Sequence, residues 1–391
     1  MAKVTAGKRG NKIRSDCYVE IQTKRTGGIK IEINSKVDSM YGESIRTTIN
    51  EMVKFFELKN ANIYIEDYGA LPPILMARFE LAVRRAYPKI EKEFLPELIK
   101  ANRYKTSKDK IRRSRLYLPG NQPKLFPNAG LHKPDGIILD LEDSVAPTEK
   151  DAAQLVVRNS LRSINFYGAE RMVRINQLPR GLDDLKFIVP HNVHVILIPK
   201  CETANDVKQV EKEVDRIKSE QKIKNDIYFM PIIESALGII NAYEIASASE
   251  YNCALAIGLE DYTADIGAER TNEGRESFYA RSALVNAAKA ARIQAIDTVF
   301  SDVNDMEGLR ESVLEAKSLG FEGKGCIHPR QIKVVNEAFA PTEEEVEKAK
   351  KIVAAFEEAR KNGVGVVSLG SKMIDPPVVK RAERTLKLIN N

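Results

Sequence analysis

The stretch that decides the fold is Ile227-Tyr-Phe-Met-Pro-Ile-Ile-Glu234, together with the next apolar run, Cys253-Ala-Leu-Ala-Ile-Gly-Leu-Glu-Asp261. Each run is short and apolar, and each is followed by a carboxylate. Segments with helical periodicity separate runs of this kind along the chain. This alternation is typical of βα units around a parallel sheet. We therefore expect Glu234 and Asp261 at the carboxyl ends of two adjacent parallel strands.

Six further runs complete a set of eight. The eight runs span 114–119, 136–141, 172–176, 194–199, 227–234, 253–258, 296–301 and 325–328. Eight parallel strands in roughly 250 residues predict a (β/α)₈ TIM-type barrel, and a doubly wound sheet fits less well. Catalytic groups of such barrels lie at the carboxyl ends of the strands. Polar residues stand there in nearly every run: Asp140, Glu142, Asp143, Arg174, Asn176, Lys200, Glu234, Glu260, Asp261 and His328.

Glu234 and Asp261 are candidate ligands of Mg²⁺. This ion prefers oxygen ligands and usually takes one or two carboxylates, with water and substrate in the other positions. A metal with open positions can bind a 2-keto or 2-hydroxy carboxylate and stabilise developing negative charge. From spacing alone, a structural pair of rim carboxylates bound by Lys or Arg is an equal alternative.

Arg174 and His328 are further candidates at strand ends. The planar guanidinium of Arg174 could bind a substrate carboxylate through two hydrogen bonds, which lysine could not. The alternative is an ion pair with Asp140, Glu142 or Asp143. Histidine is a common acid or base, but in a rim turn it more often forms structural hydrogen bonds, so we favour a structural role for His328.

The first part of the chain has a different pattern. Alternating apolar and polar residues predict two strands, over 17–23 and 29–35, that form a β-hairpin around Gly27-Gly28. A helix over 41–58, a third strand over 62–66 and a second helix over 72–86 that begins with proline follow. The result is a small ββαβα module. We expect an α+β domain over 1–87, a basic linker over 88–112 and the barrel over 113–345. A C-terminal helical segment over 346–391 is expected to reach a neighbouring subunit.

The linker region is strongly basic. Residues 84–115 hold twelve Lys and Arg against four Asp and Glu, in a chain of net charge +6. The segment lacks interleaved aromatic residues and any nucleic-acid motif, which favours a solvated linker over a nucleic-acid interface. Helical character over 91–101 argues against a free coil.

The composition is that of an ordinary globular protein, with 43% apolar and 30% charged residues. No apolar run approaches the roughly 20 residues of a membrane span, and no apolar segment follows the basic residues near Met1 as in a secretory signal. These patterns predict a cytoplasmic protein. Four widely spaced cysteines without C-x-x-C spacing predict free thiols, with Cys253 and Cys326 as small core residues.

Five sequence blocks resemble the citrate lyase β chain: Arg113-Ser-x-Leu-Tyr-Leu-Pro-Gly120, Leu139-Asp-Leu-Glu-Asp-Ser-Val145, Val173-Arg-Ile-Asn176, Ile232-Ile-Glu-Ser-Ala-Leu-Gly238 and Gly258-Leu-Glu-Asp-Tyr-x-Ala-Asp-Ile-Gly267. The resemblance spans 113 to about 385 and implies a Mg²⁺-dependent (β/α)₈ lyase of the HpcH/HpaI aldolase family, whose members act on citryl-, malyl- and methylmalyl-CoA. It implies metal binding by Glu234 and Asp261. It also implies substrate binding by Arg113, Arg174 and Glu234, supported by Glu142 and Asp143.

The N-terminal module resembles the γ chain of citrate lyase, its acyl carrier. The matching residues are Ser15-Asp16, Tyr41-Gly42, Glu66-Asp-Tyr-Gly-Ala-Leu71 and Ala77-Arg78-Phe-Glu80. The resemblance implies a phosphoribosyl-dephospho-CoA arm on Ser15. Without it, Ser15 is only a serine in a basic, mobile N-terminus. Fusion of carrier and lyase would hold a thioester at high effective concentration near the active site.

The implied reaction is retro-Claisen cleavage of a citryl thioester to oxaloacetate and an acetyl thioester. Asp375 matches an acidic residue that relatives carry on a C-terminal segment reaching a neighbouring subunit, which makes it a candidate base and predicts a homo-oligomer. Capping of a helix over 378–389 is the alternative role for Asp375. Loading of citrate would require a separate transferase (α) chain, since nothing in this sequence resembles one.

Two other functions remain open from the sequence. One is a lyase or thioesterase for malyl- or methylmalyl-CoA with a vestigial carrier domain, which the barrel motifs do not separate from the first reading. The other is a non-catalytic scaffold or carrier subunit of a citrate lyase complex. The presence of Glu234, Asp261 and Arg174 argues against that second alternative.

Overall fold

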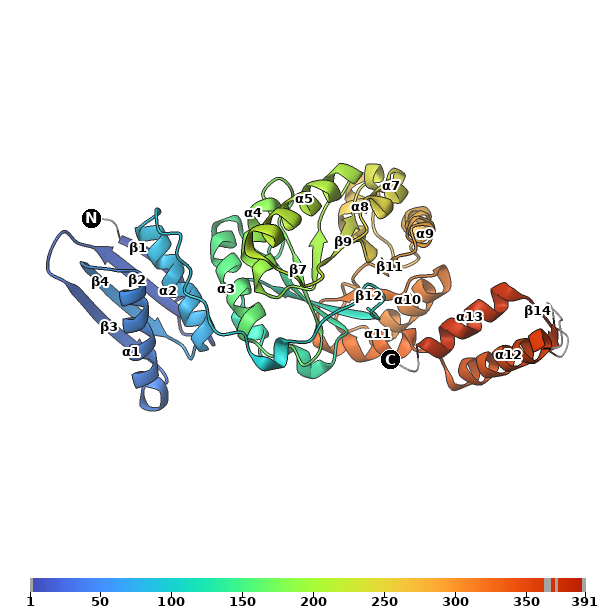
Figure 1. Cartoon of the computed structure of the whole chain (residues 1–391), viewed down its shortest axis with the longest axis horizontal. Helices are drawn as coiled ribbons and strands as arrows, with labels where there is room; N and C mark the ends of the chain where they lie inside the picture. Colours follow the sequence, from blue (N-terminus) through green and yellow to red (C-terminus); the bar gives the residue numbers. More distant parts are fainter. Residues whose placement is uncertain (1–2, 362–366, 370–371, 389–391) are drawn as a thin grey trace.

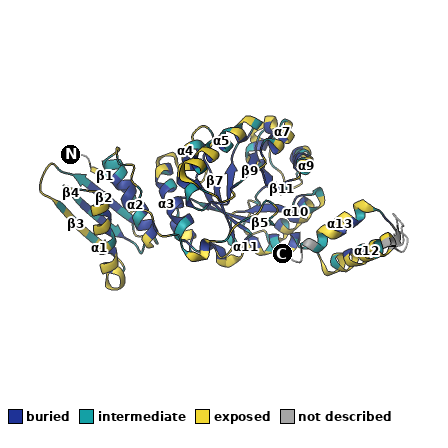
Figure 2. Ribbon diagram, viewed as in Figure 1, coloured by how far each residue is buried: buried dark blue, intermediate teal, exposed yellow. Residues whose placement is uncertain are grey.

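The computed structural model describes residues 3–361, 367–369 and 372–388. Three parts follow one another along the long axis of the molecule: a small sheet domain, a barrel and a helical hairpin (Figure 1). Buried residues concentrate in the strands and on the helix faces turned toward them (Figure 2). All four cysteines are free and buried, as the spacing predicted.

The N-terminal domain is a four-stranded sheet covered by two helices. Its elements are β1 (Lys3–Gly7), β2 (Cys17–Thr23), β3 (Ile29–Ser35), α1 (Asp38–Phe55), β4 (Ala61–Asp67) and α2 (Pro72–Ala86). The strand order is β1-β2-β4-β3, so β4 separates the two strands expected to form a hairpin. That prediction is wrong. β4 takes the centre because its Ile63 and Ile65 are fully buried, whereas the apolar residues of β3 stay half-exposed at the edge.

The first strand, β1, was not predicted. It pairs antiparallel with β2 from Lys3↔Gln22 to Gly7↔Tyr18. Lys3 and Thr5 are exposed while Val4 and Ala6 face the sheet interior, but the strand has only five residues and only Ala6 is fully buried, so its period-2 pattern is short. The pairing fixes the chain on both sides of Ser15 and contradicts the expectation of a mobile N-terminus.

Eight parallel strands close into a barrel, as expected. They are β5 (Ser114–Pro119), β6 (Gly136–Asp140), β7 (Glu170–Arg174), β8 (Val195–Ile198), β9 (Tyr228–Ile233), β10 (Ala254–Ile257), β11 (Gln294–Asp297) and β12 (Gly323–Cys326). The surrounding helices are α3 (Lys150–Ser163), α4 (Gly181–Ile188), α5 (Ala204–Gln221), α6 (Ala236–Ile240), α7 (Ala242–Ser247), α8 (Leu259–Asp265), α9 (Arg275–Ala290), α10 (Met306–Leu319) and α11 (Pro329–Phe339).

The last two barrel strands begin and end earlier than the apolar runs suggested. β11 ends at Asp297, although Val299 and Phe300 continue the apolar run. Asp297 Oδ2 accepts a 2.6 Å hydrogen bond from Lys324 Nζ of the neighbouring strand β12, on the side of the sheet that faces α9, whose Arg281 also contacts Asp297. Ion pairing across two strands thus overrides the local apolar pattern.

The basic segment after α2 is solvated only in part. Asn102 and Arg112 are fully buried against the barrel, and the Arg112 guanidinium forms a bidentate pair with Glu170 at 2.7 and 2.8 Å. The stretch 91–101 is extended apart from a short 3₁₀ turn at Lys100–Asn102, so the expected helix is absent. Buried partners on the barrel thus hold Arg112, whereas the basic side chains of the segment that are exposed to solvent are Lys89, Lys92, Lys100, Arg103 and Lys105.

The N-terminal domain packs on the barrel through α2 and α3. Glu80 of α2 accepts two 2.8 Å hydrogen bonds from Arg158 of α3, and both side chains are fully buried. Asn159 Nδ2 also donates to the carbonyl oxygen of Pro73 at 2.8 Å. Satisfied buried charges of this kind fix the orientation of the two domains.

The chain ends in a helical hairpin beyond the barrel (Figure 1). Its elements are α12 (Glu343–Lys361), β13 (Val367–Leu369), β14 (Lys372–Ile374) and α13 (Pro376–Lys387). A small apolar cluster of its own holds the two helices together: Ala349, Ile352, Ile374, Val379 and Ala382. Within the described ranges, no helix is long and apolar enough to span a membrane.

Candidate functional site

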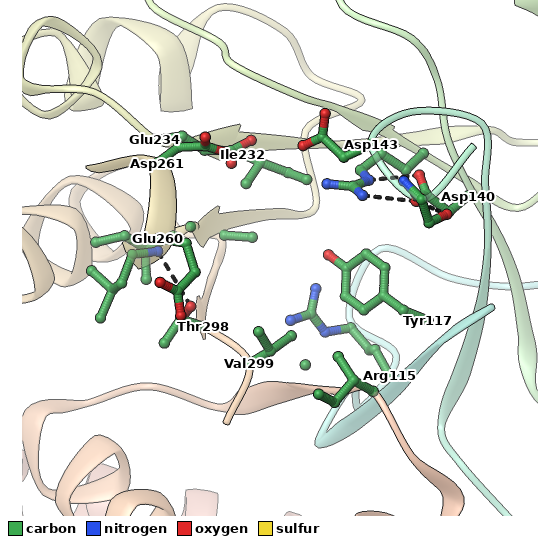
Figure 3. Close-up of a pocket in the computed structure, with 18 of the residues that line it drawn as sticks. Arg115, Tyr117, Asp140, Asp143, Ile232, Glu234, Glu260, Asp261, Thr298 and Val299 are labelled. Carbon is green, nitrogen blue, oxygen red and sulfur yellow. Dashed lines mark hydrogen bonds and ion pairs between the residues drawn. The ribbon is translucent and has the colours of Figure 1, made fainter. Parts of the chain in front are cut away.

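A cavity of about 360 Å³ opens at the carboxyl ends of the barrel strands. Figure 3 shows side chains from several strands that converge on it. The charged and hydroxyl-bearing residues that line it are Arg115, Tyr117, Asp140, Asp143, Ser144, Arg174, Glu234, Glu260, Asp261, Asp297 and Thr298. Polar chemistry therefore concentrates at the end of the barrel where the strand pattern predicted it.

Glu234 and Asp261 lie side by side at this rim (Figure 3). Glu234 directly follows β9, and Asp261 stands in the first turn of α8 after β10. Burial, followed by the hydrogen bond with Asp261, raises the pKa of Glu234 to about 8. Gly258 makes room for this arrangement, because a Cβ there would lie 2.6 Å from Glu234 Oε2.

Two acidic groups in contact repel each other when both are ionised, so the pair favours a proton or a cation between them. Within the described residues, no three His, Cys, Asp or Glu side chains converge as a metal site. A cation at Glu234 and Asp261 would have two protein ligands and keep its other positions for water and substrate. That donor set fits Mg²⁺.

Arg174 ends β7 and forms the ion pair named as its structural alternative. Its Nε and Nη2 donate to the two carboxylate oxygens of Asp140 at 2.7 and 2.8 Å, and Nη1 lies 2.8 Å from Glu142 Oε2. Asp140 uses two of the five N–H donors of the guanidinium. The pair fixes the side chain while leaving further donors at the cavity wall.

Glu142 and Asp143 follow β6 and contact Lys200. The Lys200 ammonium lies 3.2 Å from Glu142 Oε1, 3.5 Å from Asp143 Oδ1 and 4.0 Å from Asp261 Oδ2. Its backbone N–H also donates to Glu234 Oε1 at 3.2 Å. Lys200 thus partly neutralises an acidic rim, and the structure brings Glu142 and Asp143 to the edge of the candidate metal pair.

Arg113 is absent from the cavity, and its expected role in substrate binding is wrong. It precedes β5 at the opposite end of the barrel, where its Nε and Nη2 donate to Asp135 at 2.9 and 3.0 Å. The polar residues of β5 that line the cavity are Arg115 and Tyr117. Alternation of side chains along a strand could have identified them once the register was known, but the apolar run itself gives no register.

His328 and Asp375 both cap helices. His328 Nδ1 accepts from the backbone N–H of Arg330 at the start of α11, as the structural reading expected. Asp375 accepts from the backbone N–H of Val378 at the start of α13 and does not line the cavity of its own chain. Its catalytic role stays a prediction.

Ser15 lies in an ordered turn between β1 and β2. Its backbone N–H donates to the carbonyl oxygen of Tyr68 at 3.0 Å, and its φ of 53° is in the left-handed region, where serine is uncommon. The next residue, Asp16, is buried in a bidentate pair with Arg78, both bonds being 2.9 Å. Two neighbouring elements therefore hold Ser15 in a fixed position at the surface.

Comparisons with known proteins agree with this two-part organisation. Residues 113–329 match the family model described as HpcH/HpaI aldolase/citrate lyase. Residues 5–86 match the ACP model, described as malonate decarboxylase delta subunit. Both parts of the resemblance seen in the sequence blocks are thus supported.

Individual relatives align over most of their length. Citrate lyase subunit beta from Leuconostoc mesenteroides subsp. cremoris is 42% identical over 285 residues, covering 72% of this chain and 94% of that protein. L-malyl-CoA/beta-methylmalyl-CoA lyase from Cereibacter sphaeroides is 33% identical, covering 69% and 92%. The structure of protein CitE from Mycobacterium tuberculosis in complex with magnesium, acetoacetate and coenzyme A covers 73% of this chain and 100% of that one, at 29% identity and a TM-score of 0.60. The chain therefore belongs to the HpcH/HpaI aldolase/citrate lyase family, as a lyase with an acyl-carrier-type domain ahead of its barrel.

Proposed function

We propose that this lyase cleaves a citryl thioester to oxaloacetate and an acetyl thioester at the cavity, with Mg²⁺ held by Glu234 and Asp261. The observation that carries the proposal is the contact between these two carboxylates beside Arg174. Magnesium in the CitE complex and the identity to citrate lyase β support it. When bound, the ion would supply positive charge to the hydroxyl and carboxylate oxygens of the substrate.

Arg174 would orient the carboxylate next to the reacting hydroxyl. Asp140 holds the guanidinium rigidly, and the N–H donors that Asp140 leaves free would bind the substrate. Removal of the hydroxyl proton by a base would let the alkoxide become a ketone. The electron pair of the broken carbon–carbon bond would pass to the acetyl thioester as an enolate, which then takes up a proton.

The base is proposed to be Asp375 from a neighbouring copy of the chain. In its own chain Asp375 lies on the terminal hairpin beyond the barrel (Figure 1). A homo-oligomer would let the hairpin of one copy reach the cavity of another. Asp375→Asn should then lose turnover while keeping keto-acid affinity; unchanged turnover would exclude this base.

The carrier role is proposed for Ser15, with a phosphoribosyl-dephospho-CoA arm. The left-handed backbone conformation of Ser15 supports the proposal that this serine is modified, since strained backbone positions cluster at functional sites. Citrate would be loaded by a separate transferase chain in the cytoplasm. An intact-mass spectrum of native protein should show the arm, and Ser15→Ala should lack it; a native mass equal to the sequence mass would remove the carrier role.

The second candidate is cleavage of malyl- or methylmalyl-CoA, favoured by the 33% identity to the Cereibacter sphaeroides enzyme. Full-length protein with Mg²⁺ should be assayed on citryl-CoA and L-malyl-CoA, with the keto-acid product identified. Oxaloacetate from citryl-CoA is expected, and EDTA should abolish its release. Glyoxylate from malyl-CoA, with citryl-CoA untouched, would assign the second activity instead.

A matched pair of variants tests the metal site. Glu234→Gln should lower kcat/KM by at least about 10³-fold, because loss of metal charge stabilisation is worth several kcal/mol. It should also remove the rise in melting temperature that Mg²⁺ gives the wild type. Glu244→Gln, at an exposed position on α7, is the control and should leave both unchanged. Full activity of Glu234→Gln would contradict the proposal.

A further inference from the structure

We propose that Arg115 binds the carboxylate of the substrate farthest from the reacting hydroxyl, and so selects keto acids with two carboxylates over those with one. The inference rests on the proposed function and adds to it the group that determines which keto acid the site binds. It comes from a charged side chain in the cavity floor that the mechanism above does not use.

Arg115 projects from β5 into the interior of the barrel, and its side chain extends toward the cavity that Glu234 and Asp261 also line (Figure 3). The residue is 1% exposed. Nη1 makes a 3.0 Å contact with the sulfur of Met230, and Nε has no hydrogen-bond partner. Among the residues that the structure describes, no carboxylate forms an ion pair with it.

A buried guanidinium without an anion is energetically costly, because water has been removed and nothing replaces it. Arg112, on the same stretch of chain, shows the usual solution: every one of its three nitrogens donates to an oxygen. Arg115 lacks these partners. An unpaired, buried cation that faces a cavity indicates that an anionic ligand completes it.

Gly325 of β12 stands beside Arg115 in the strand register. A Cβ at this position would lie 2.6 Å from Val299 Cγ1 and 3.3 Å from Tyr117 Cε2. Glycine is needed there because the side chains of Val299 and Tyr117 already pack against this part of β12 and form the wall beside Arg115. The cavity thus offers a metal and Arg174 at its rim and Arg115 at its floor.

This spacing of charges matches the chemistry of a citryl thioester. The hydroxyl and its neighbouring carboxylate would occupy the metal end, and the remaining carboxymethyl group would extend to Arg115. The product oxaloacetate keeps both carboxylates. Pyruvate and glyoxylate have one carboxylate each, so they would leave Arg115 unpaired.

The direct test is a calorimetric titration of full-length protein in Mg²⁺ with oxaloacetate and with pyruvate. We expect the wild type to bind oxaloacetate at least 10-fold more tightly. Arg115→Met should weaken oxaloacetate binding by about 10- to 100-fold, the usual range for a lost charge-assisted hydrogen bond. Its affinity for pyruvate should stay within about 3-fold, since that ligand makes no use of the arginine. Arg115→Lys, which keeps the charge without the planar donor pair, should fall between.

Stability separates a ligand-binding role from a structural one. In the absence of ligand, Arg115→Met should melt at the same temperature as the wild type or higher, because a buried unpaired charge has been removed. A clearly lower melting temperature of the folded variant would assign Arg115 to structure and overturn the inference.

The two proposals fail differently. Wild-type protein that binds oxaloacetate and pyruvate equally, or Arg115→Met that weakens both equally, would overturn the role of Arg115 and leave the metal-dependent lyase intact. Wild-type protein that binds neither keto acid in Mg²⁺ would overturn both proposals. The wild-type comparison does not depend on any variant and remains decisive if Arg115→Met does not fold.

Discussion

The two ends of the barrel both bury charged side chains, but they treat them differently. At the end near the linker, Arg112 and Glu170 are fully buried, and their charges are paired bidentately. Carbonyl oxygens of Ser107, Lys108 and Lys110 accept from the remaining guanidinium N–H groups. In the cavity that opens at the opposite end, Glu234 contacts another acid, and Arg115 at the cavity floor has no anion.

The difference shows how buried charge separates structure from function in one domain. At the first end, Arg112 and Glu170 neutralise each other and fix the linker to the barrel, so no ligand is needed to balance their charges. Incomplete pairing at the cavity costs stability, which a metal ion and a dicarboxylate would recover on binding. The same chemical substitution should therefore have opposite consequences at the two ends.

The largest effect is expected for Glu170→Gln. Leaving Arg112 buried without its carboxylate should cost about 3–5 kcal/mol of unfolding free energy, measured by urea denaturation. Activity per folded molecule should persist, because the cavity lies at the other end. The control Glu347→Gln breaks an exposed pair with Lys350 and should leave stability unchanged. A loss from Glu170→Gln as small as the control's would contradict the comparison.

Acidification probes the same end of the barrel through His194. Burial, then the neighbouring Arg171, lowers the pKa of His194 to about 3, whereas the unfolded chain titrates near 6.5. The unfolded state thus binds more protons between these values, so stability is full above pH 6.5 and is lost as the pH falls. From pH 6.5 to 4.5 this residue should cost about 2 kcal/mol. His194→Gln should show a correspondingly shallower pH dependence in urea; an identical dependence would assign the loss to other groups.

A smaller effect is expected at the contact between the carrier domain and the barrel. Glu80→Gln removes one partner of Arg158, but Glu93 remains 2.8 Å from its Nη1. The loss should be about 1–2 kcal/mol. Hydrogen exchange should increase in α2 and α3 together. Increased exchange in α2 alone would indicate that the domains are not held by this pair.

The smallest effect on stability is expected for Glu234→Gln without metal. Burial and the hydrogen bond that Glu234 donates to Asp261 favour the protonated carboxyl, and an amide resembles that form in charge and shape. The unfolding free energy should change by less than about 1 kcal/mol, in contrast to Glu170→Gln. A loss of several kcal/mol would show that the ionised carboxylate is structural.

Much of the site could be predicted from the sequence. Short apolar runs that end in Asp140, Arg174, Glu234 and Asp261 identified both the barrel and its functional end, because parallel strands bring their carboxyl ends to one rim. Family resemblance added the metal. It also suggested Arg113, which the structure pairs with Asp135 away from the cavity.

The misses share a cause. The hairpin prediction failed because strand pairing is decided by partners distant in sequence, here β4 with both β2 and β3. The predicted end of β11 was too late, because Asp297 pairs with Lys324 of the adjacent strand β12. Arg112, in the basic linker, was expected to be solvated because its acidic partner, Glu170, lies far along the chain.

The sequence by itself determined the eight apolar runs, the carboxylates that end them and the carrier-type domain before them, because these depend on local periodicity and composition. Only the tertiary structure decided which of the two arginines, Arg113 and Arg115, faces the cavity, and that Arg115 has no anionic partner. The physical reason is that pairing of a buried charge depends on what other strands bring within about 3 Å of it. No local pattern records those distances.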